Sequence, residues 1–134
     1  YDPEALAVTG FNLHTQITRG IDPKEAMQQF AHWLTSVTDA TSKPIFVGFN
    51  AAFDWSFINY YFHVYLGHNP FGFTALDIKA LYMGATGCDW QDTRSSRIDA
   101  RFNLKNHGSH NALDDALYQA EMFLKINEYM REKH

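Results

Sequence analysis

The feature that most constrains the fold is a short apolar run that passes directly into a helix. Residues 44–49 read Pro-Ile-Phe-Val-Gly-Phe; they are rich in β-branched and aromatic side chains and predict a buried strand. Residues 50–66 place apolar side chains over one broad face and stop at Gly67, which predicts a helix. A strand that turns into a helix carries its polar junction residues at the carboxyl edge of a sheet, where open α/β folds bind ligands. The expected fold class is therefore α/β.

Two further stretches extend this alternation of strands and helices. Residues 22–25, Asp-Pro-Lys-Glu, combine a cap, a proline and a capping-box glutamate, and predict an amphipathic helix that runs to about Thr38. Residues 74–77 predict a short strand that feeds a helix containing Ala80 and Leu81. The other expectations are a short helix over residues 2–8, a loop over 11–20, a turn over 69–72, and a loop-rich segment over 84–109 with one short helix near 98–102.

Length and composition narrow the class of protein. A chain of 134 residues with 46% hydrophobic content suffices for one globular domain with a real core. The net charge is −4 without a cluster of lysine and arginine, which argues against a nonspecific coating of nucleic-acid backbone but permits a carboxylate site that holds phosphates through metal ions.

The single cysteine, Cys88, fits a reducing compartment. No apolar run approaches the roughly 18 residues that span a membrane, and no signal segment is present, so we expect a cytoplasmic protein without a membrane partner.

The entrance to the last predicted helix places a histidine close to a carboxylate. His110 and Asp115 stand five residues apart, and apolar residues recur at helical spacing from residue 113 to residue 124. Asn111 is expected to cap this helix, which leaves His110 just outside it and Asp115 in its first turn. A purely structural interpretation stays open: Asp114 and Asp115 would complement the helix dipole, and His110 would be an ordinary loop residue.

Polar and aromatic residues near the ends of the predicted strands are further candidates. Asn50 and Asp54 follow the first strand, with a turn residue and a helix-start charge as their structural alternatives. Phe53 and Phe57 lie on the same helix and are most simply explained as core. Asp77 ends the second strand, where capping of the following helix is favoured over a role in a site. Basic residues of the 84–109 segment offer phosphate contacts or form a solvated face: Arg94, Arg97, Arg101 and Lys105.

Two motifs together resemble a known family of nucleases. Residues 48–54 (Gly-Phe-Asn-Ala-Ala-Phe-Asp) and 110–116 (His-Asn-Ala-Leu-Asp-Asp-Ala) are similar, in order and spacing, to the second and third motifs of the DEDDh family of 3′–5′ exonucleases. Ribonuclease T and the exonucleases that resemble polymerase proofreading subunits are the nearer kin. Residues 2–7 and 69–71 extend the similarity over nearly the whole chain. Phe49 stands where many relatives have histidine, at a position that is not the family's base.

The resemblance implies a ribonuclease-H-like exonuclease fold, with a central mixed sheet flanked by helices, and a role for each matched residue. Asp115 matches the acid that coordinates the first metal ion, and Asp54 matches the acid that supports the metal pair, commonly through water. His110 matches the general base that activates the attacking water. The implied substrates are single-stranded or frayed 3′ ends of DNA or RNA. Matches to positions near the terminal nucleotide are Asn50, Phe53 and Phe57.

These implied roles suit the chemistry of phosphodiester hydrolysis. Two Mg²⁺ or Mn²⁺ ions about 3.5–4 Å apart neutralise the phosphoryl oxygens and stabilise the leaving oxygen. Such hard ions prefer carboxylate oxygens, and Mg²⁺ keeps several of its waters. A histidine with a pKa of about 6.5 accepts the proton of the attacking water at neutral pH. Together with the resemblance, this chemistry predicts a 3′–5′ exonuclease with two divalent ions and a histidine base.

The sequence departs from the family pattern at its beginning. The family carries its first motif, Asp-x-Glu followed by threonine, on the first strand of the sheet, and three strands normally precede the helix with which this sequence begins. Residues 2–4 spell Asp-Pro-Glu, but a proline argues against a central strand. Residues 1–134 are therefore expected to be the carboxy-terminal part of a single exonuclease domain that lacks its N-terminal strands. With Asp54 and Asp115 alone, we expect weak metal binding and negligible catalysis.

Two functions of other classes stay open. A non-catalytic nucleic-acid-binding or assembly module would keep the exonuclease fold without the first motif. A different metal-dependent hydrolase is disfavoured, because the other histidines lack the spacing of zinc ligands. The preference for RNA or DNA is left open, because no motif here reads the 2′-hydroxyl. Formation of a homodimer, which is common in the ribonuclease T branch, is left open as well.

Overall fold

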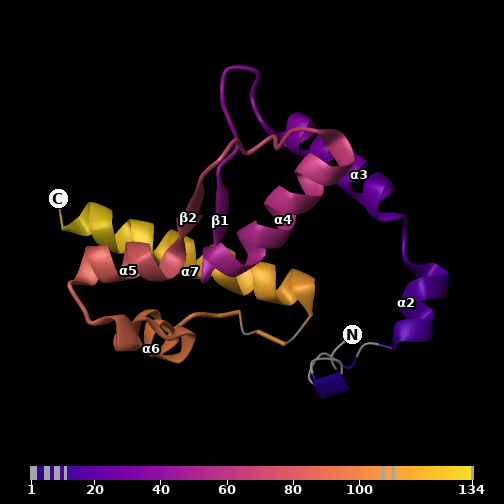
Figure 1. Cartoon of the computed structure of the whole chain (residues 1–134). Coiled ribbons are helices and arrows are strands. Elements are labelled where there is room, and N and C mark those ends of the chain that lie inside the picture. The colour runs from indigo at the N-terminus through magenta and orange to yellow at the C-terminus, as the bar shows by residue number, and fades with distance from the viewer. Residues whose placement is uncertain are drawn as a thin grey trace. The chain divides into compact units, whose positions relative to one another are not determined.

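The computed structural model describes residues 3–4, 7, 10, 12–106, 108–109 and 111–133. This part of the chain is α/β, mostly helical, with a two-stranded parallel sheet (Figure 1). No helix within these ranges is long and apolar enough to cross a membrane. The elements in chain order are α2 (Leu13–Arg19), α3 (Pro23–Val37), β1 (Phe46–Gly48), α4 (Ala51–Leu66), β2 (Ala75–Asp77), α5 (Ile78–Thr86), the 3-10 helix η1 (Trp90–Thr93), α6 (Ser95–Phe102) and α7 (Ala112–Glu132).

Local capping signals set most of these boundaries, as the sequence predicts. Asp22 caps α3, where its Oδ1 accepts the backbone N–H groups of Lys24 at 2.9 Å and Glu25 at 3.3 Å. Gly67 ends α4 in the left-handed conformation, with φ +74°, which costs little for a residue without a Cβ. The predicted strand over 44–49 is shorter than expected and covers only Phe46–Gly48.

Two segments expected to be loops contain more helix than predicted. α2 forms within residues 11–20, where Asn12 caps it by accepting the Thr15 N–H at 3.1 Å. None of its residues is buried, so no apolar stripe could have revealed it. Within residues 84–109, the structure forms η1, and it starts α6 at Ser95 rather than near residue 98. The predicted helix over residues 2–8 lies partly outside the described residues. Its expected cap, Asp2, is not among them.

The chain divides into two compact units. Unit 1 comprises Tyr1–Phe46 and Phe53–Ala75, and unit 2 comprises Val47–Ala52 and Leu76–His134. In unit 1, Met27 and Leu34 of α3 are buried with Phe62 of α4. Aromatic rings surround this cluster, with the Phe30 and Phe62 centroids 5.4 Å apart. Unit 1 is therefore held mainly by dispersion and by aromatic edge contacts.

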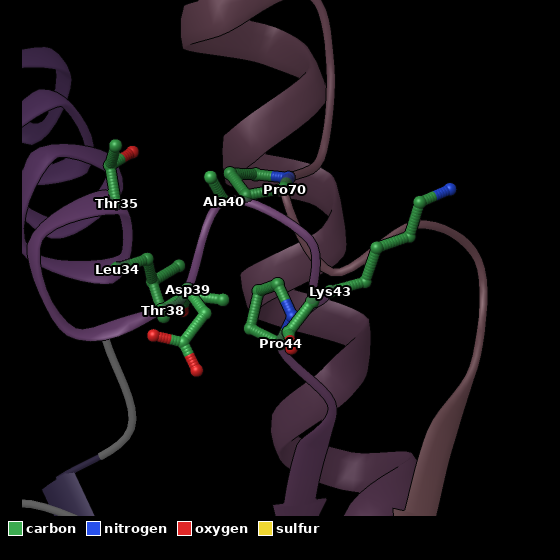
Figure 2. Close-up of a pocket in the computed structure, with 9 residues that line it drawn as sticks. Leu34, Thr35, Thr38, Asp39, Ala40, Lys43, Pro44 and Pro70 are labelled. Carbon is green, nitrogen blue, oxygen red and sulfur yellow. The ribbon is translucent and has the colours of Figure 1, made fainter.

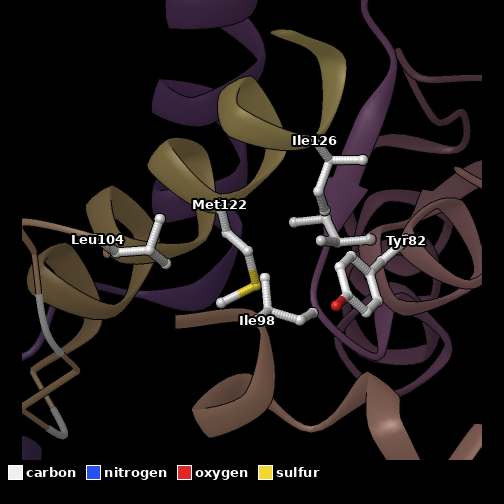
Figure 3. Packing of buried hydrophobic residues seen from close by; sticks show 6 residues of the cluster. Tyr82, Ile98, Leu104, Met122 and Ile126 are labelled. Atoms are coloured by element: carbon white, nitrogen blue, oxygen red, sulfur yellow. The ribbon is translucent and has the colours of Figure 1, made fainter. Parts of the chain in front are cut away.

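Unit 2 is built around α7. Buried side chains from α5, α6 and α7 meet in one cluster, and in Figure 3 Met122 and Ile126 of α7 lie close to Ile98 and Tyr82. Each such side chain contributes about 1.5–3 kcal/mol when it is fully removed from water. The cluster consists of Ile78, Tyr82, Ile98, Leu104, Met122 and Ile126.

The parallel sheet fixes where the strand ends lie. Because β1 and β2 run in the same direction, the ends at Gly48 and Asp77 share one edge of the sheet. This arrangement confirms the expected α/β class. A central mixed sheet does not form within the described residues, because the sequence supplies only these two short β-rich runs. The ribonuclease-H-like arrangement remains a prediction.

Candidate active site

The first turn of α7 carries the acidic pair that the sequence singles out. Asn111 caps the helix, and its side-chain oxygen accepts the backbone N–H groups of Leu113 at 3.0 Å and Asp114 at 3.4 Å. Asp114 and Asp115 both lie in this first turn, where the helix dipole favours negative charge. The predicted cap and the position of Asp115 are therefore confirmed.

The loop before α7 is attached to this pair by hydrogen bonds. Ser109 donates its backbone N–H to Asp115 Oδ1 at 3.0 Å and its hydroxyl to Asp114 Oδ2 at 2.6 Å. A Cβ added to Gly108 would stand 3.0 Å from Asp115 Oδ1, so the backbone packs tightly against the carboxylate there. His110 lies outside the described residues, although its neighbours Ser109 and Asn111 are both hydrogen-bonded.

A second carboxylate holds the same loop further upstream. Glu121 accepts the backbone N–H groups of Lys105 and Asn106, each at 2.8 Å, and the Asn106 side-chain amide at 2.7 Å. These bonds stabilise the ionised form, so they hold the pKa of Glu121 below its ordinary value. Residues 105–109 are thus attached to α7 at both ends. The role of Glu121 could not be predicted from the sequence, because nothing in the local pattern of a helix-surface carboxylate indicates that it binds backbone 16 residues away.

Asp115 and Asp54 differ in how they are held. Asp115 is half-buried, and its Oδ2 accepts no hydrogen bond within the described part of the chain. Asp54 is exposed in the first turn of α4 and accepts no hydrogen bond from any described residue. Asp54 belongs to unit 1 and Asp115 to unit 2.

Each of these carboxylates suits a divalent ion as a single oxygen ligand. The described residues contain no group of three or more His, Cys, Asp or Glu that could hold a metal. A complete site for the expected ions therefore needs ligands beyond the described ones.

The turn between β1 and α4 is anchored by two side chains of unit 2. Gln119 of α7 accepts the Phe49 N–H at 2.9 Å, and Asp77 Oδ2 accepts the Ala51 N–H at 2.6 Å. Between them Asn50 adopts a left-handed conformation, with φ +62°, which asparagine tolerates better than most residues. Asp77 also caps α5 as expected, since its Oδ1 accepts the Ala80 N–H at 2.8 Å. Local spacing could not reveal the Gln119 contact, which joins residues 70 apart in sequence.

The two phenylalanines assigned to the nucleotide are not core residues. Phe53 is 63% exposed and Phe57 is 49% exposed, and their rings meet edge to face at 5.3 Å. The simple explanation that both are ordinary core is therefore wrong. Two neighbouring exposed aromatic rings on one helix suit stacking against a base.

Most of the basic residues of segment 84–109 lie on the surface, as the solvated-face alternative predicts. Arg94, Arg97, Arg101 and Lys105 are all exposed. Arg101 donates to the Tyr129 hydroxyl at 3.0 Å and lies 4.8 Å from the centre of that ring. This arginine is therefore held against α7 by one of its donors and by the ring of Tyr129.

A hollow of about 290 Å³ lies in unit 1, between the end of α3, the loop over 38–44 and Pro70. In Figure 2 the side chains of Asp39 and Lys43 point away from each other at its border. Asp39 and Lys43 are both exposed, and none of the candidate residues above lines this hollow.

Comparison with known proteins decides the family. A sequence model of the 3'-5' exoribonuclease Rv2179c-like domain matches residues 14–127. The chain is also 51% identical, over 131 residues, to a protein named 3'-5' DNA exonuclease Cap18 from Escherichia coli; the match covers 98% of this chain and 70% of that protein.

The chain belongs to this exonuclease family. The family match runs through the β1–α4 turn and the first turn of α7, so it includes both motifs that the sequence analysis singled out. The expectation of an exonuclease is confirmed at this level, and the names indicate 3′–5′ polarity for the exonuclease domain and its relative.

Proposed function

We propose that the chain is a metal-dependent 3′–5′ exonuclease of the DEDDh type that removes nucleotides from single-stranded or frayed 3′ ends. The observation that carries this proposal is its 51% identity, over 98% of the chain, to a 3'-5' DNA exonuclease. The family description names an exoribonuclease, whereas the relative acts on DNA according to its name. We propose DNA as the preferred substrate, because identity over nearly the whole chain is the more specific of the two similarities.

In this proposal Asp54 and Asp115 bind divalent ions, and His110 is the general base. Two observations support their assignment as oxygen ligands: Asp115 Oδ2 accepts no hydrogen bond from a described residue, and the carboxylate of Asp54 is exposed. Bound Mg²⁺ or Mn²⁺ would supply positive charge to the phosphoryl and leaving oxygens. The pairing of the two carboxylates rests on the resemblance to the DEDDh motifs.

Side chains of unit 2 would orient the groups that meet the substrate. The Ser109 N–H fixes one oxygen of Asp115, which leaves the other to face a ligand. Asn111 and Ser109 flank His110, and both are bound to the first turn of α7 or to each other. Gln119 and Asp77 hold the turn that presents Asn50. A site held in this way loses little conformational freedom when the substrate binds.

The remaining carboxylates of a DEDDh site would come from outside residues 1–134. This part of the proposal rests on the resemblance to the DEDDh family, whose first motif, Asp-x-Glu followed by threonine, does not occur in residues 1–134. A protein extended upstream should therefore cleave efficiently, and residues 1–134 alone should show negligible turnover.

The test is release of mononucleotides from 3′-labelled, single-stranded DNA and RNA in the presence of Mn²⁺. In the extended protein, we expect Asp115→Asn to lower the rate by more than about a hundred-fold, because it removes a metal ligand rather than a group that only orients one. Asp114→Asn is the matched control, since it alters a neighbouring carboxylate of the same turn that only accepts the Ser109 hydroxyl.

Four results would count against parts of the proposal. Equal rates for Asp115→Asn and wild type would contradict the assigned role of Asp115. Faster cleavage of RNA would contradict the substrate preference. Efficient turnover by residues 1–134 alone would show that no further ligands are needed. Tight binding of 3′ ends without cleavage by the extended protein would instead support a non-catalytic binding module.

A further inference from the structure

A lysine and two aromatic rings cluster at the carboxyl edge of the sheet. Lys79, the second residue of α5, places its ammonium 4.3 Å from the centre of the Trp90 ring and 5.8 Å from the centre of the Phe49 ring. Phe49 immediately precedes Asn50, the residue assigned above to the terminal nucleotide. All of these residues belong to unit 2, so their mutual positions are part of one compact body.

Among the described residues, no carboxylate neutralises the charge of Lys79. No ion pair to Lys79 occurs among the residues that the structure describes, whereas Lys125 pairs with Glu128 at 2.8 Å. Lys79 is also half-buried, whereas most of the other described lysines and arginines are exposed. Aromatic faces hold a cation while leaving its hydrogen-bond donors available to an anion. A backbone phosphate would complete the surroundings of this ammonium.

Trp90 is large, partly exposed and fixed to a rigid piece of backbone. Its side chain is 49% exposed, although it opens the short helix η1. The hydroxyl of Thr93, a fully buried residue, donates to the Trp90 carbonyl at 2.7 Å. An indole presented in this way suits stacking against a nucleic-acid base, which tolerates any sequence because every base has a π face.

The cluster adjoins the turn that presents Asn50. Asp77, two residues before Lys79, accepts the Ala51 N–H, and Gln119 accepts the Phe49 N–H from α7. Gln119 stands one helical turn after Asp115. A continuous series of contacts therefore links α7, which bears Asp115, to Trp90. Gln119 of α7 binds Phe49, and Lys79 lies over the rings of both Phe49 and Trp90.

We propose that Lys79 and Trp90 form a binding site for the single strand just upstream of the terminal nucleotide. The Lys79 ammonium binds a backbone phosphate, and the exposed face of Trp90 stacks on the adjoining base. This inference rests on the proposed function, because it takes the terminal nucleotide to lie at Asn50. It adds a reason for a single-strand preference, since a base paired in a duplex is not free to stack on an indole.

Tryptophan fluorescence tests the stacking contact without cleavage. A short oligo-dT is titrated into the extended protein in EDTA, and the emission of its tryptophans is followed. We expect quenching in wild type, and loss of most of that quenching in Trp90→Phe. Trp33→Phe is the matched control, because Trp33 is similarly exposed, at 54%, but lies in unit 1 on α3. Quenching that persists in Trp90→Phe would overturn the stacking contact.

The salt dependence of binding tests the phosphate contact. Each phosphate neutralised on a single strand contributes about 0.7 to the slope of log K against log salt concentration, so Lys79→Gln should flatten that slope by about 0.7. Lys133→Gln is the matched control: it removes the same charge from a lysine that also lies over an aromatic ring, at 4.6 Å from the Tyr129 centre. Lys133 follows the far end of α7, roughly 27 Å along the helix from Asp115 at 1.5 Å per residue. Equal slopes for the two variants would overturn the contact.

Cleavage kinetics separate failure of this site from failure of the proposed function. For a longer oligonucleotide, we expect Trp90→Ala to raise KM by roughly five-fold to a hundred-fold with kcat unchanged. For the p-nitrophenyl ester of thymidine 5′-monophosphate, which carries no nucleotide upstream of the terminal one, KM should not change. Wild-type cleavage with unaltered KM in the variant would overturn the Lys79–Trp90 site and leave the exonuclease proposal intact. A wild-type protein that neither binds nor cleaves the oligonucleotide would overturn both.

Discussion

The two units are stabilised by different kinds of contact. Unit 1 buries Met27, Leu34 and Phe62 among aromatic rings, and its candidate site residues Asp54 and Phe53 are exposed. Unit 2 buries a larger apolar cluster and also uses polar side chains to hold irregular backbone in place. These polar side chains are Asp77, Asp115, Gln119 and Glu121.

This difference shows which candidate site residues are held in a fixed orientation by other side chains. A ligand or substrate group is placed accurately when its own side chain is fixed by further hydrogen bonds. Asp115 and the Asn50 turn have such bonds, whereas Asp54 has none among the described residues. We therefore expect substitutions in the buried core of unit 1 to act mainly on stability, and substitutions of the polar side chains that hold the backbone of unit 2 to act mainly on the site.

The largest expected effect on stability is at the centre of unit 1. Phe62 is fully buried, with ring partners Phe30 at 5.4 Å and Phe71 at 6.1 Å. Phe62→Ala should lower the free energy of unfolding by about 3–5 kcal/mol, through lost transfer energy and a cavity. Hydrogen exchange measured separately for each unit should show the greater loss of protection in unit 1. An equal loss of protection in both units would contradict the claim that Phe62 stabilises unit 1 in particular.

A core substitution in unit 2 should cost slightly less. Met122 is fully buried on α7, and Met122→Ala should lower the free energy of unfolding by about 2–5 kcal/mol. Leu124→Ala is the control on the same helix, because Leu124 is 59% exposed, and we expect a change within about 0.5 kcal/mol. Chemical denaturation measures both. Similar losses for the two variants would contradict the assignment of the buried face of α7.

Structural features that depend only on residues close together in the sequence, such as helix caps, could be predicted from it. Asp22, Asn111 and Asp77 were identified as helix caps from their local setting, and the structure confirms each of them. α2 escaped prediction because its seven residues include only two apolar side chains, Leu13 and Ile17, which are too few to define a periodic stripe. The extent of exposure of Phe53 was also misjudged, because an aromatic residue on a helix is usually core.

The parts of the candidate site that join distant residues could not be predicted in this way. The bonds from Gln119 to Phe49 and from Asp77 to Ala51 link residues 70 and 26 apart. A glutamine or aspartate at these positions does not reveal such a partner. A solvent-exposed side chain with no partner would occupy the same place in the sequence pattern. The individual roles of Asp54, His110 and Asp115 still rest on their resemblance to family motifs.

A smaller effect is expected where a single polar side chain of unit 2 is removed. Gln119→Ala leaves the partly buried Phe49 N–H without its acceptor, which costs about 1–3 kcal/mol. Because the same bond holds the turn of Asn50, we expect kcat to fall more than the stability change alone explains. Asn127→Ala is a control on the same helix, since Asn127 bonds only within α7, to the Phe123 carbonyl at 3.0 Å. Unchanged kcat in Gln119→Ala would show that the turn does not need this bond.

The smallest effect concerns pH and the loop before α7. The pKa of Glu121 lies below its ordinary value, because the ionised carboxylate accepts the N–H groups of Lys105 and Asn106. For a carboxyl group with a lowered pKa, the stabilisation is present above the unfolded-state pKa and is lost as the pH falls through the folded-state pKa. Glu121→Gln should therefore reduce hydrogen-exchange protection of the Lys105 and Asn106 amides at neutral pH, and the difference from wild type should shrink in acid. A difference that stays constant into acid would contradict this account of the loop.

Our central proposal is that Asp54 and Asp115 bind the same metal ions. Mn²⁺ binding measured by calorimetry for wild type, Asp54→Asn, Asp115→Asn and the double variant of the extended protein tests it most directly. Residues that share one site give non-additive changes in binding free energy. We predict that either single substitution removes most of the affinity and that the second adds little. Losses that simply add, as for two independent sites, would contradict the claim.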